Sequence, residues 1–458
     1  MLPAIQIRQG FVLATVIYLA IFILIFLSVS PVFGVGLLVL SYCTLAIKSV
    51  VKTILFPFYL FPFMFLIRAQ SPDNQILAIL PDISVVLAIV THFLICGISR
   101  SNLLLFALIT SLSAMTFLLN LSHLNDLNYS FLIIRQYVLP LLFLFVVINS
   151  GSKDPQLEAE ALRISTISFA LVALISLLNI SSIITVPRSM EALYPFLNYS
   201  ENTDNITQVS RRVGEGIFFP RLNLFTGGAL GSSAAILLVL GLIALFCSEG
   251  SKFRILKLSS VPLIIASIGT LSTSIVIALI GCYAAFYFFI KRRSISKVLG
   301  ITVIFFLLTT VSVVGMSPLD YLLETSLGAF IVYIAGLDLK EVLFGVGPRL
   351  TTSGFEFIPN KFIIDVGIFR TFVEIGIFGF CVFAIILLLI FRSGFNASYH
   401  NNDTGVRPYL AIFVVFMLSV HANMTALPPF YPLFCAVCLG MIRPSRALSK
   451  TSELSSSI

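Results

Sequence analysis

Long apolar runs recur from one end of the chain to the other, and they constrain its fold more than any other feature. Each run approaches the roughly 20 residues with which a helix crosses a bilayer. Polar residues separate the runs into fourteen segments: 11–29, 32–47, 53–67, 83–98, 102–119, 131–149, 164–184, 222–247, 258–272, 275–290, 297–315, 367–391, 407–424 and 427–442. We therefore predict about fourteen transmembrane helices.

The composition excludes a soluble multidomain enzyme. Only 10% of the residues are charged and 58% are apolar, whereas about 25% of a soluble domain is charged. Too few charges are present to cover a surface that faces water. We predict an all-α polytopic membrane protein, with residues 1–458 forming a single integral-membrane domain.

The seven cysteines all lie within apolar runs. This placement supports neither a disulfide framework nor a metal site made of thiolates. Cys435 and Cys438 have CxxC spacing, but they lie inside one predicted span without a partner pair, so we interpret them as packing residues. The first run, 11–29, is longer than the core of a signal peptide and is predicted to remain as a span. No metal or cofactor is expected.

The distribution of charge supports this threading. With both termini in the cytoplasm, the cytoplasmic segments hold 18 of the 28 cations and six of the 20 acids, a balance of +12. The outer segments and span ends hold the other ten cations and fourteen acids, a balance of −4, so that the bias follows the positive-inside rule. We predict that segment 256–290 crosses the membrane twice, because the basic clusters before and after it then lie on the same side.

Two connections are long, and the threading places both outside, as periplasmic loops at about 185–221 and 316–366. Long loops often carry function, so we look for chemistry on this face. Eight of the ten cations predicted there are arginines: Arg68, Arg135, Arg188, Arg211, Arg212, Arg221, Lys340, Arg349, Lys361 and Arg370.

Arginine on the outer face is not needed for topology, and its fork binds phosphate through two hydrogen bonds. We interpret the group, and above all Arg211, Arg212, Arg221 and Arg349, as a clamp for phosphate or pyrophosphate. The alternative is that each arginine pairs with one of the fourteen outer acids or reaches lipid headgroups.

Three further positions are candidates because ionisable groups are costly inside a span. Glu374 lies about two turns into its predicted span, with Arg370 one turn earlier as its expected partner. Arg135 lies at the mouth of another span, and His421 lies near the end of the thirteenth; a structural role is the alternative for His421. Gly345 and Gly347 could bring backbone amides close to an anion, whereas Gly376 is interpreted as a position of close packing between spans.

The chain resembles the bacterial O-antigen polymerase and O-antigen ligase superfamily of membrane glycosyltransferases, most strongly over 205–395. The first element is Arg212-Val-Gly214 followed by Phe219-Pro-Arg-Leu-Asn223. The second is Leu271-Ser-Thr-Ser274. The third is Gly345-Val-Gly347, followed after a polar gap by the E-x-G-x-x-G segment that begins at Glu374.

Two departures favour the polymerase (Wzy-type) branch over the ligase branch. Ligases typically carry a His followed by Asn nine residues before that Glu, where this chain has Asp365 followed by Val366. They also usually carry an Arg directly after the second element, where this chain has Ile275.

The resemblance implies a GT-C-like, metal-independent enzyme in the bacterial inner membrane. Its substrate would be an undecaprenyl-pyrophosphate-linked oligosaccharide, and its reaction would join repeat units into a polysaccharide at the periplasmic face. Membrane lipid and a chain-length regulator protein are the further partners considered, and nucleic acid is not.

The expected mechanism needs a base and an anion site. A carboxylate can take the proton of the attacking sugar hydroxyl, and arginines can stabilise the departing pyrophosphate. We expect Asp365 and Arg349 to be catalytic. We expect Arg211, Arg212, Arg221, Arg135, Arg370, Glu374 and His421 to bind substrate. The alternatives are an O-antigen ligase or another polysaccharide-joining enzyme, and a flippase for lipid-linked oligosaccharide.

Overall fold

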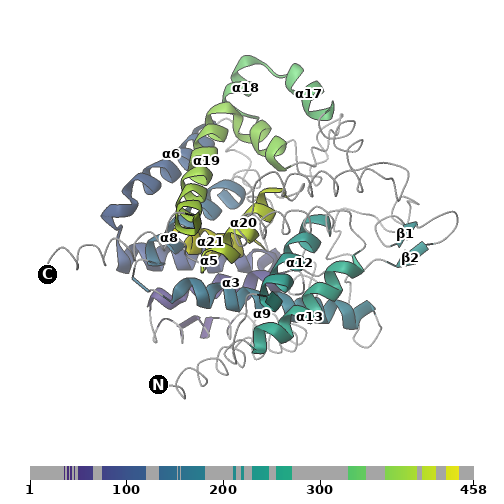
Figure 1. The fold of residues 1–458 in the computed structure, drawn as a ribbon. Coiled ribbons are helices and arrows are strands. Elements are labelled where there is room, and N and C mark those ends of the chain that lie inside the picture. Colours follow the sequence, from purple (N-terminus) through teal and green to yellow (C-terminus); the bar gives the residue numbers. More distant parts are fainter. Residues whose placement is uncertain are drawn as a thin grey trace.

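The computed structural model is helical in the parts of the chain that it describes, apart from one short pair of strands (Figure 1). Besides a few single residues before position 67, it describes 50–64, 75–119, 134–151, 153–154, 156–180, 210–212, 218–220, 230–246, 254–270, 328–346, 367–399, 405–418 and 430–442.

The elements follow one another along the chain with these bounds: η1 (Val50–Leu55), α3 (Phe56–Leu60), η2 (Phe61–Phe63), α5 (Gln75–Cys96), η3 (Arg100–Asn102), α6 (Leu103–Leu119), η5 (Ile134–Val138), α8 (Leu139–Gly151), α9 (Leu157–Ile180), β1 (Ser210–Arg212), β2 (Phe218–Pro220), α12 (Leu230–Phe246), α13 (Arg254–Gly269), α17 (Gly328–Ala335), α18 (Leu339–Phe344), α19 (Gly367–Tyr399), α20 (Arg407–Leu418) and α21 (Tyr431–Ile442).

Helix α21 lies at the centre of the bundle. It contacts α8, α9, α19 and α20, and every residue from Tyr431 to Met441 is buried. An apolar helix that is buried on all sides belongs to the core rather than to one face. The free thiols of Cys435 and Cys438 are buried within it, as the prediction of packing residues requires.

Ten of the fourteen predicted spans coincide with described helical segments, from 53–67 to 427–442. The predicted spans at 11–29, 275–290 and 297–315, and nearly all of the one at 32–47, lie outside the described residues. The helix bounds differ from the prediction mainly at starting points: α5 begins at Gln75 rather than near 83, and α9 at Leu157 rather than near 164.

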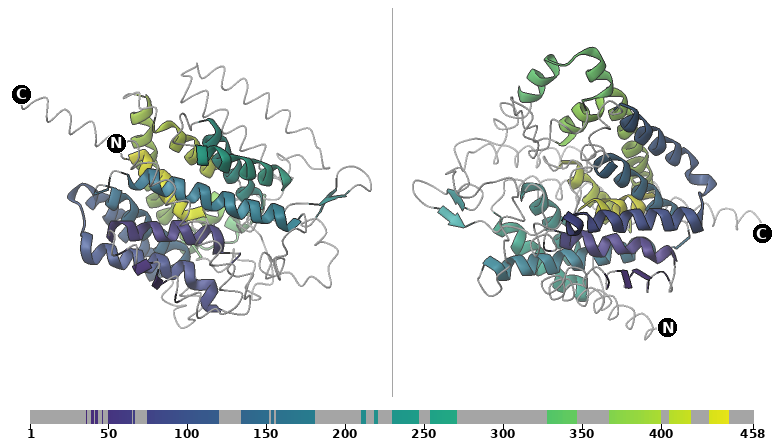
Figure 2. Two further views of the ribbon diagram at one scale, coloured as in Figure 1. Left: turned by 90° about the horizontal axis from the view of Figure 1, so that it is seen from below. Right: turned by 180° about the vertical axis from the view of Figure 1, so that it is seen from behind.

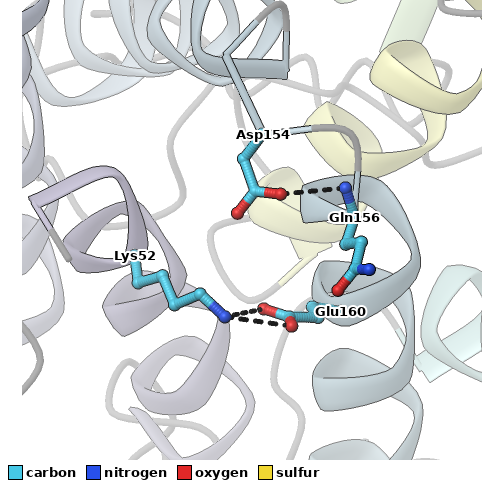
Figure 3. Close-up of polar contacts among 4 residues, drawn as sticks. All are labelled: Lys52, Asp154, Gln156 and Glu160. Carbon is cyan, nitrogen blue, oxygen red and sulfur yellow. Dashed lines mark hydrogen bonds and ion pairs between the residues drawn. The ribbon is translucent and has the colours of Figure 1, made fainter. Parts of the chain in front are cut away.

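Local polar contacts explain the early start of α9. The Asp154 carboxylate accepts a hydrogen bond of 2.9 Å from the backbone N–H of Gln156 (Figure 3). Glu158 and Glu160 follow in the first turn, where negative charge is favourable. Glu160 also forms an ion pair of 3.1 Å with Lys52 of η1 (Figure 3). The apolar pattern alone did not reveal this polar first turn.

Two of the described helices are long and apolar enough to cross a membrane, judged by length and composition alone. They cover Leu157–Asn179 and Thr371–Tyr399, with 23 and 29 residues. Further apolar helices of 10–17 residues surround them. The apolar length agrees with the prediction of a helical membrane protein.

In α5 the polarity of the exposed and buried sides is the reverse of that in a helix of a soluble protein. Its exposed side includes Val86, Val90 and Leu94, whereas Asp82 and His92 are buried. A second exposed apolar row, Leu258, Val261, Ile265 and Ile268, follows α13 at helical spacing. Outward apolar rows with inward polar groups are typical of helices that face lipid.

Candidate functional site

Four of the candidate residues lie outside the described residues: Arg221, Arg349, Asp365 and His421. Their assigned roles therefore stay predictions. The backbones of Arg211, Arg212 and Arg370 are described, and the side-chain surroundings of Arg135 and Glu374 are described as well.

The first element of the resemblance folds partly as a hairpin. Strands β1 and β2 pair antiparallel, with Arg211 opposite Phe219 and Arg212 opposite Phe218. The hairpin lies at the edge of the molecule, away from the central helices, in all three views (Figures 1 and 2). The sequence reading placed both arginines in a loop without strands. The structure adds that Arg212 and Phe219, one from each half of the motif, lie on paired strands.

The third element brings two distant segments into backbone contact. Helix α19 is interrupted at Gly376, which has φ 66° and ψ −178°. The backbone N–H of Val346 donates to the carbonyl of Val373 at 3.1 Å. Residues that lie about thirty positions apart thus meet where α18 reaches α19 (Figure 1).

The two glycines of this contact have no room for a side chain. Gly345 has φ 86°, and a Cβ placed on it would lie 2.6 Å from the Gly376 nitrogen. A Cβ on Gly376 would overlap the backbone of Leu343, Phe344 and Gly345. Gly376 was expected to pack between spans. It instead packs against the loop after α18, because a positive φ turns the chain out of the helix there.

Glu374 lies next to this interruption and is 2% exposed. Arg370 is four residues earlier on the same helix, as expected, but its side chain is not described and the pair stays a prediction. The interruption at Gly376 follows this carboxylate two residues later.

Arg135 has a partner from another helix. Its Nε atom lies 3.0 Å from Oδ2 of Asp82 on α5, and the side chains are 27% and 6% exposed. Pairing with an acid was the alternative to phosphate binding for each of these arginines, and Arg135 is paired in this way with Asp82. Arg135 itself stands in η5, a π-helical turn that leads into α8. Turns of this kind occur frequently at functional sites.

Tyr431 completes this group from the start of α21. It is 5% exposed and lies within electrostatic range of both Asp82 and Arg135. Its hydroxyl makes no hydrogen bond within the described part of the chain. We call Asp82, Arg135 and Tyr431 the polar triad. Sequence reasoning missed Asp82 and Tyr431. The signal for Asp82 was an acid at the start of an apolar run, opposite in charge to Arg135.

A second polar group lies at the other end of α5 and α8. The Asn149 side chain donates to His92 Nε2 and to the Gly97 carbonyl, both at 2.8 Å. Its Oδ1 accepts from Asn102 Nδ2 and from the Ser99 backbone N–H, both at 3.0 Å. These bonds tie the turn after α5 to the end of α8. The sequence reading did not single out any of these residues.

The chemistry available at the described positions is that of charge and hydrogen bonding. No group of three or more His, Cys, Asp or Glu side chains suited to a metal ion occurs among the described residues. In the polar triad the guanidinium and the phenol can donate hydrogen bonds to a phosphate, and the carboxylate can accept one from a sugar hydroxyl.

Comparisons with known proteins do not identify a family for this chain. No protein-family model matches it, and no curated protein or solved structure matches it significantly.

Proposed function

We propose that the chain is an integral-membrane polysaccharide polymerase of the O-antigen type, working in the bacterial inner membrane with both termini in the cytoplasm. It joins undecaprenyl-pyrophosphate-linked oligosaccharide units at the periplasmic face, in a bundle of about fourteen spans. The observation that carries the proposal is the contact between the Gly345 segment and the kink at Gly376. Both segments belong to the third element of the resemblance.

Contacts between helices support the proposed threading, because each joins groups assigned to the same side. Lys52 and Glu160 are both assigned to the cytoplasm and form an ion pair. Lys153, from the same side, donates to the carbonyl of Cys96 at the inner end of α5. Asp82 and Arg135, both assigned to the outer side, form the other pair.

The proposed reaction moves the growing glycan from its lipid carrier to a new unit. A hydroxyl of the new unit attacks the anomeric carbon of the growing chain, and its proton passes to the carboxylate of Asp365. The bond between that carbon and the pyrophosphate breaks, and the lipid pyrophosphate leaves. Arg349 and the outer arginines stabilise the charge that develops on it.

Deleting the gene and separating surface glycan on a gel tests this function. A strain without a polymerase keeps lipid A-core capped with a single repeat unit. A strain without a ligase has bare core and accumulates long lipid-linked chains. Capped long chains that persist after deletion would refute the polymerase.

A flippase is a second candidate, because the described interior holds buried ionisable groups at Asp82, His92 and Glu374. Such groups mark transport paths in many membrane proteins. The same deletion separates the two functions: loss of a flippase leaves single lipid-linked repeats facing the cytoplasm, whereas loss of a polymerase leaves them facing the periplasm.

Substitutions test the site. We expect Asp365→Asn and Arg349→Ala to abolish chain extension at normal protein level, because removing one charged contact to the transition state costs about 10²–10³ in rate. Asp403→Asn and Arg392→Ala are the matched controls, since both residues are assigned to the cytoplasm and Arg392 is exposed at the far end of α19. Wild-type chain length in the first two variants rules out their roles.

A further inference from the structure

The polar triad combines three irregular helix positions. Asp82 follows Pro81, a proline inside α5. Arg135 lies in the π-helical turn that precedes Pro140 of α8. Proline removes a backbone donor and disturbs the helix around it. Asp82 thus follows a proline inside α5, Arg135 stands in a π-helical turn, and Tyr431 is the first residue of α21.

The triad has bonding capacity that the described chain does not use. Arg135 Nε and Asp82 Oδ2 are close, but neither atom makes a well-aligned hydrogen bond within the described residues, and the same holds for the Tyr431 hydroxyl. Guanidinium carries five N–H donors in a planar fork. Buried polar groups are normally satisfied, so a group with unused capacity calls for a partner.

Its surroundings favour a ligand over bulk water. The ring of Tyr431 packs edge-on against Phe61 and Phe143, with centroids 4.6 and 5.8 Å away. Asp82 is nearly buried, whereas the side chain of Arg135 is 27% exposed. Arg135 therefore joins a buried carboxylate to the surface. The aromatic rings around Tyr431 lower the local dielectric there, and a low dielectric strengthens charge interactions.

We propose that the polar triad is a subsite for a lipid-borne phosphate, with Arg135 as the binding group, Asp82 as the residue that positions its guanidinium, and Tyr431 as a further donor. A guanidinium fork matches two phosphate oxygens. This inference rests on the proposed function for the identity of its ligand, a polyprenyl pyrophosphate. The shared chemistry also allows the phosphate of an anionic phospholipid.

The competing explanation is that Asp82 and Arg135 only hold α5 against the start of α8. A pair that serves only to hold the two helices together keeps its mutual attraction when the two charges are exchanged. The exchange variant Asp82→Arg/Arg135→Asp separates the two explanations, because it preserves the pair but places a carboxylate where the phosphate is expected to bind.

The experiment measures binding to the full-length protein in neutral nanodiscs. The probes are undecaprenyl pyrophosphate, undecaprenol and phosphatidylglycerol. The variants are Arg135→Gln, Arg135→Lys, Asp82→Asn, Tyr431→Phe and the exchange variant. Arg100→Gln is the control, since Arg100 is an exposed arginine in η3 outside the triad. Thermal unfolding is recorded for every variant.

We expect undecaprenyl pyrophosphate to bind the wild type at least about tenfold more tightly than undecaprenol does, since a charged hydrogen bond contributes that much or more. Arg135→Gln and the exchange variant lose this preference, although the exchange variant unfolds close to the wild-type temperature. Asp82→Asn and Tyr431→Phe weaken binding about three- to tenfold. Arg100→Gln binds as the wild type does.

Restored binding in the exchange variant overturns the subsite, as does equal binding of undecaprenol and undecaprenyl pyrophosphate. If Arg135→Gln does not fold, the test uses Tyr431→Phe and Arg135→Lys instead. Wild-type binding of undecaprenyl pyrophosphate in both of these variants overturns the proposed subsite. Arg135-dependent binding of phosphatidylglycerol alone would support a phosphate subsite. It would refute undecaprenyl pyrophosphate as the ligand of that subsite.

Discussion

Asn149 is the side chain that joins the C-terminal ends of α5 and α8. Since its Nδ2 donates to His92 Nε2, that ring nitrogen accepts, and the Nδ1–H of the neutral ring donates to Ser150 Oγ at 2.7 Å. A buried network whose members satisfy one another makes the arrangement specific, and one missing member leaves the others unpaired.

Asn149→Ala tests this role at the scale of one residue. We expect a loss of about 3–5 kcal/mol in unfolding free energy, because several buried donors and acceptors lose their partner at about 1–3 kcal/mol each. Thermal or denaturant unfolding of the purified protein measures the loss. Ser111→Ala is the control, since the Ser111 hydroxyl is exposed and donates to the Leu108 carbonyl of its own helix. Equal stability of the two variants would contradict the network.

The contact between the loop after α18 and the kink of α19 shows how two glycines shape an element. Gly345 and Gly376 both have positive φ, and each occupies the space that a side chain on the other would need. Without a Cβ on either residue, the two backbones can lie in contact, and α18 is anchored to α19. The kink in α19 therefore has a specific cause, the backbone conformation of Gly376, rather than general flexibility.

Gly376→Ala and Gly345→Ala should each disrupt this anchor. Both glycines combine a positive φ with ψ of 168° and −178°, a conformation that is essentially restricted to glycine and costs other residues about 1–3 kcal/mol. The overlap with the facing backbone adds to this cost. Faster hydrogen exchange or proteolysis at 339–346 in each variant would report the loss. Gly36→Ala is the matched control, because a Cβ there meets nothing within 4 Å. If all three variants exchange alike, the contact does not hold the loop.

At the scale of the molecule, the exposed apolar rows distinguish a membrane protein from a soluble one. Val90 is 48% exposed in the middle of the predicted span 83–98, on the side of α5 opposite the buried His92. In water an exposed position tolerates a charge, whereas a charge at the centre of a span costs about 2.5–3.5 kcal/mol in insertion.

Val90→Asp should therefore lower the amount of protein in the membrane fraction severalfold, while Val90→Leu leaves it unchanged. Quantitative blotting of fractions from cells that express each variant measures this. Normal accumulation of Val90→Asp would show that this face of α5 does not contact lipid.

The sidedness of the chain can be tested with single cysteines in a cysteine-free background. Lys340→Cys lies on α18, assigned to the periplasm, and Gln156→Cys lies before α9, assigned to the cytoplasm; both positions are exposed. An impermeant maleimide should label the first in spheroplasts and the second only after the membrane is opened. Labelling of both before opening would refute the threading.

The sequence by itself determined the helical class and the placement of most helices, because apolar runs of this length have few other solutions. The resemblance also placed Gly345, Gly376 and Glu374 in one sequence element, although it did not predict that the two glycines lie in contact. Helix starts were less predictable, as α9 shows: a hydrogen bond from the Gln156 backbone N–H to the Asp154 side chain precedes the helix, and an ion pair of Glu160 lies in its polar first turn.

Only the tertiary structure decided which residues meet. Asp82, Arg135 and Tyr431 lie on three helices spread over some 350 positions, and His92 and Asn149 are more than fifty apart. A periodic pattern shows which face of a helix is apolar, but not which helix lies opposite. Because nearly every helix here is apolar on all sides, that choice depends on packing in three dimensions, and so does the partner of each buried charge.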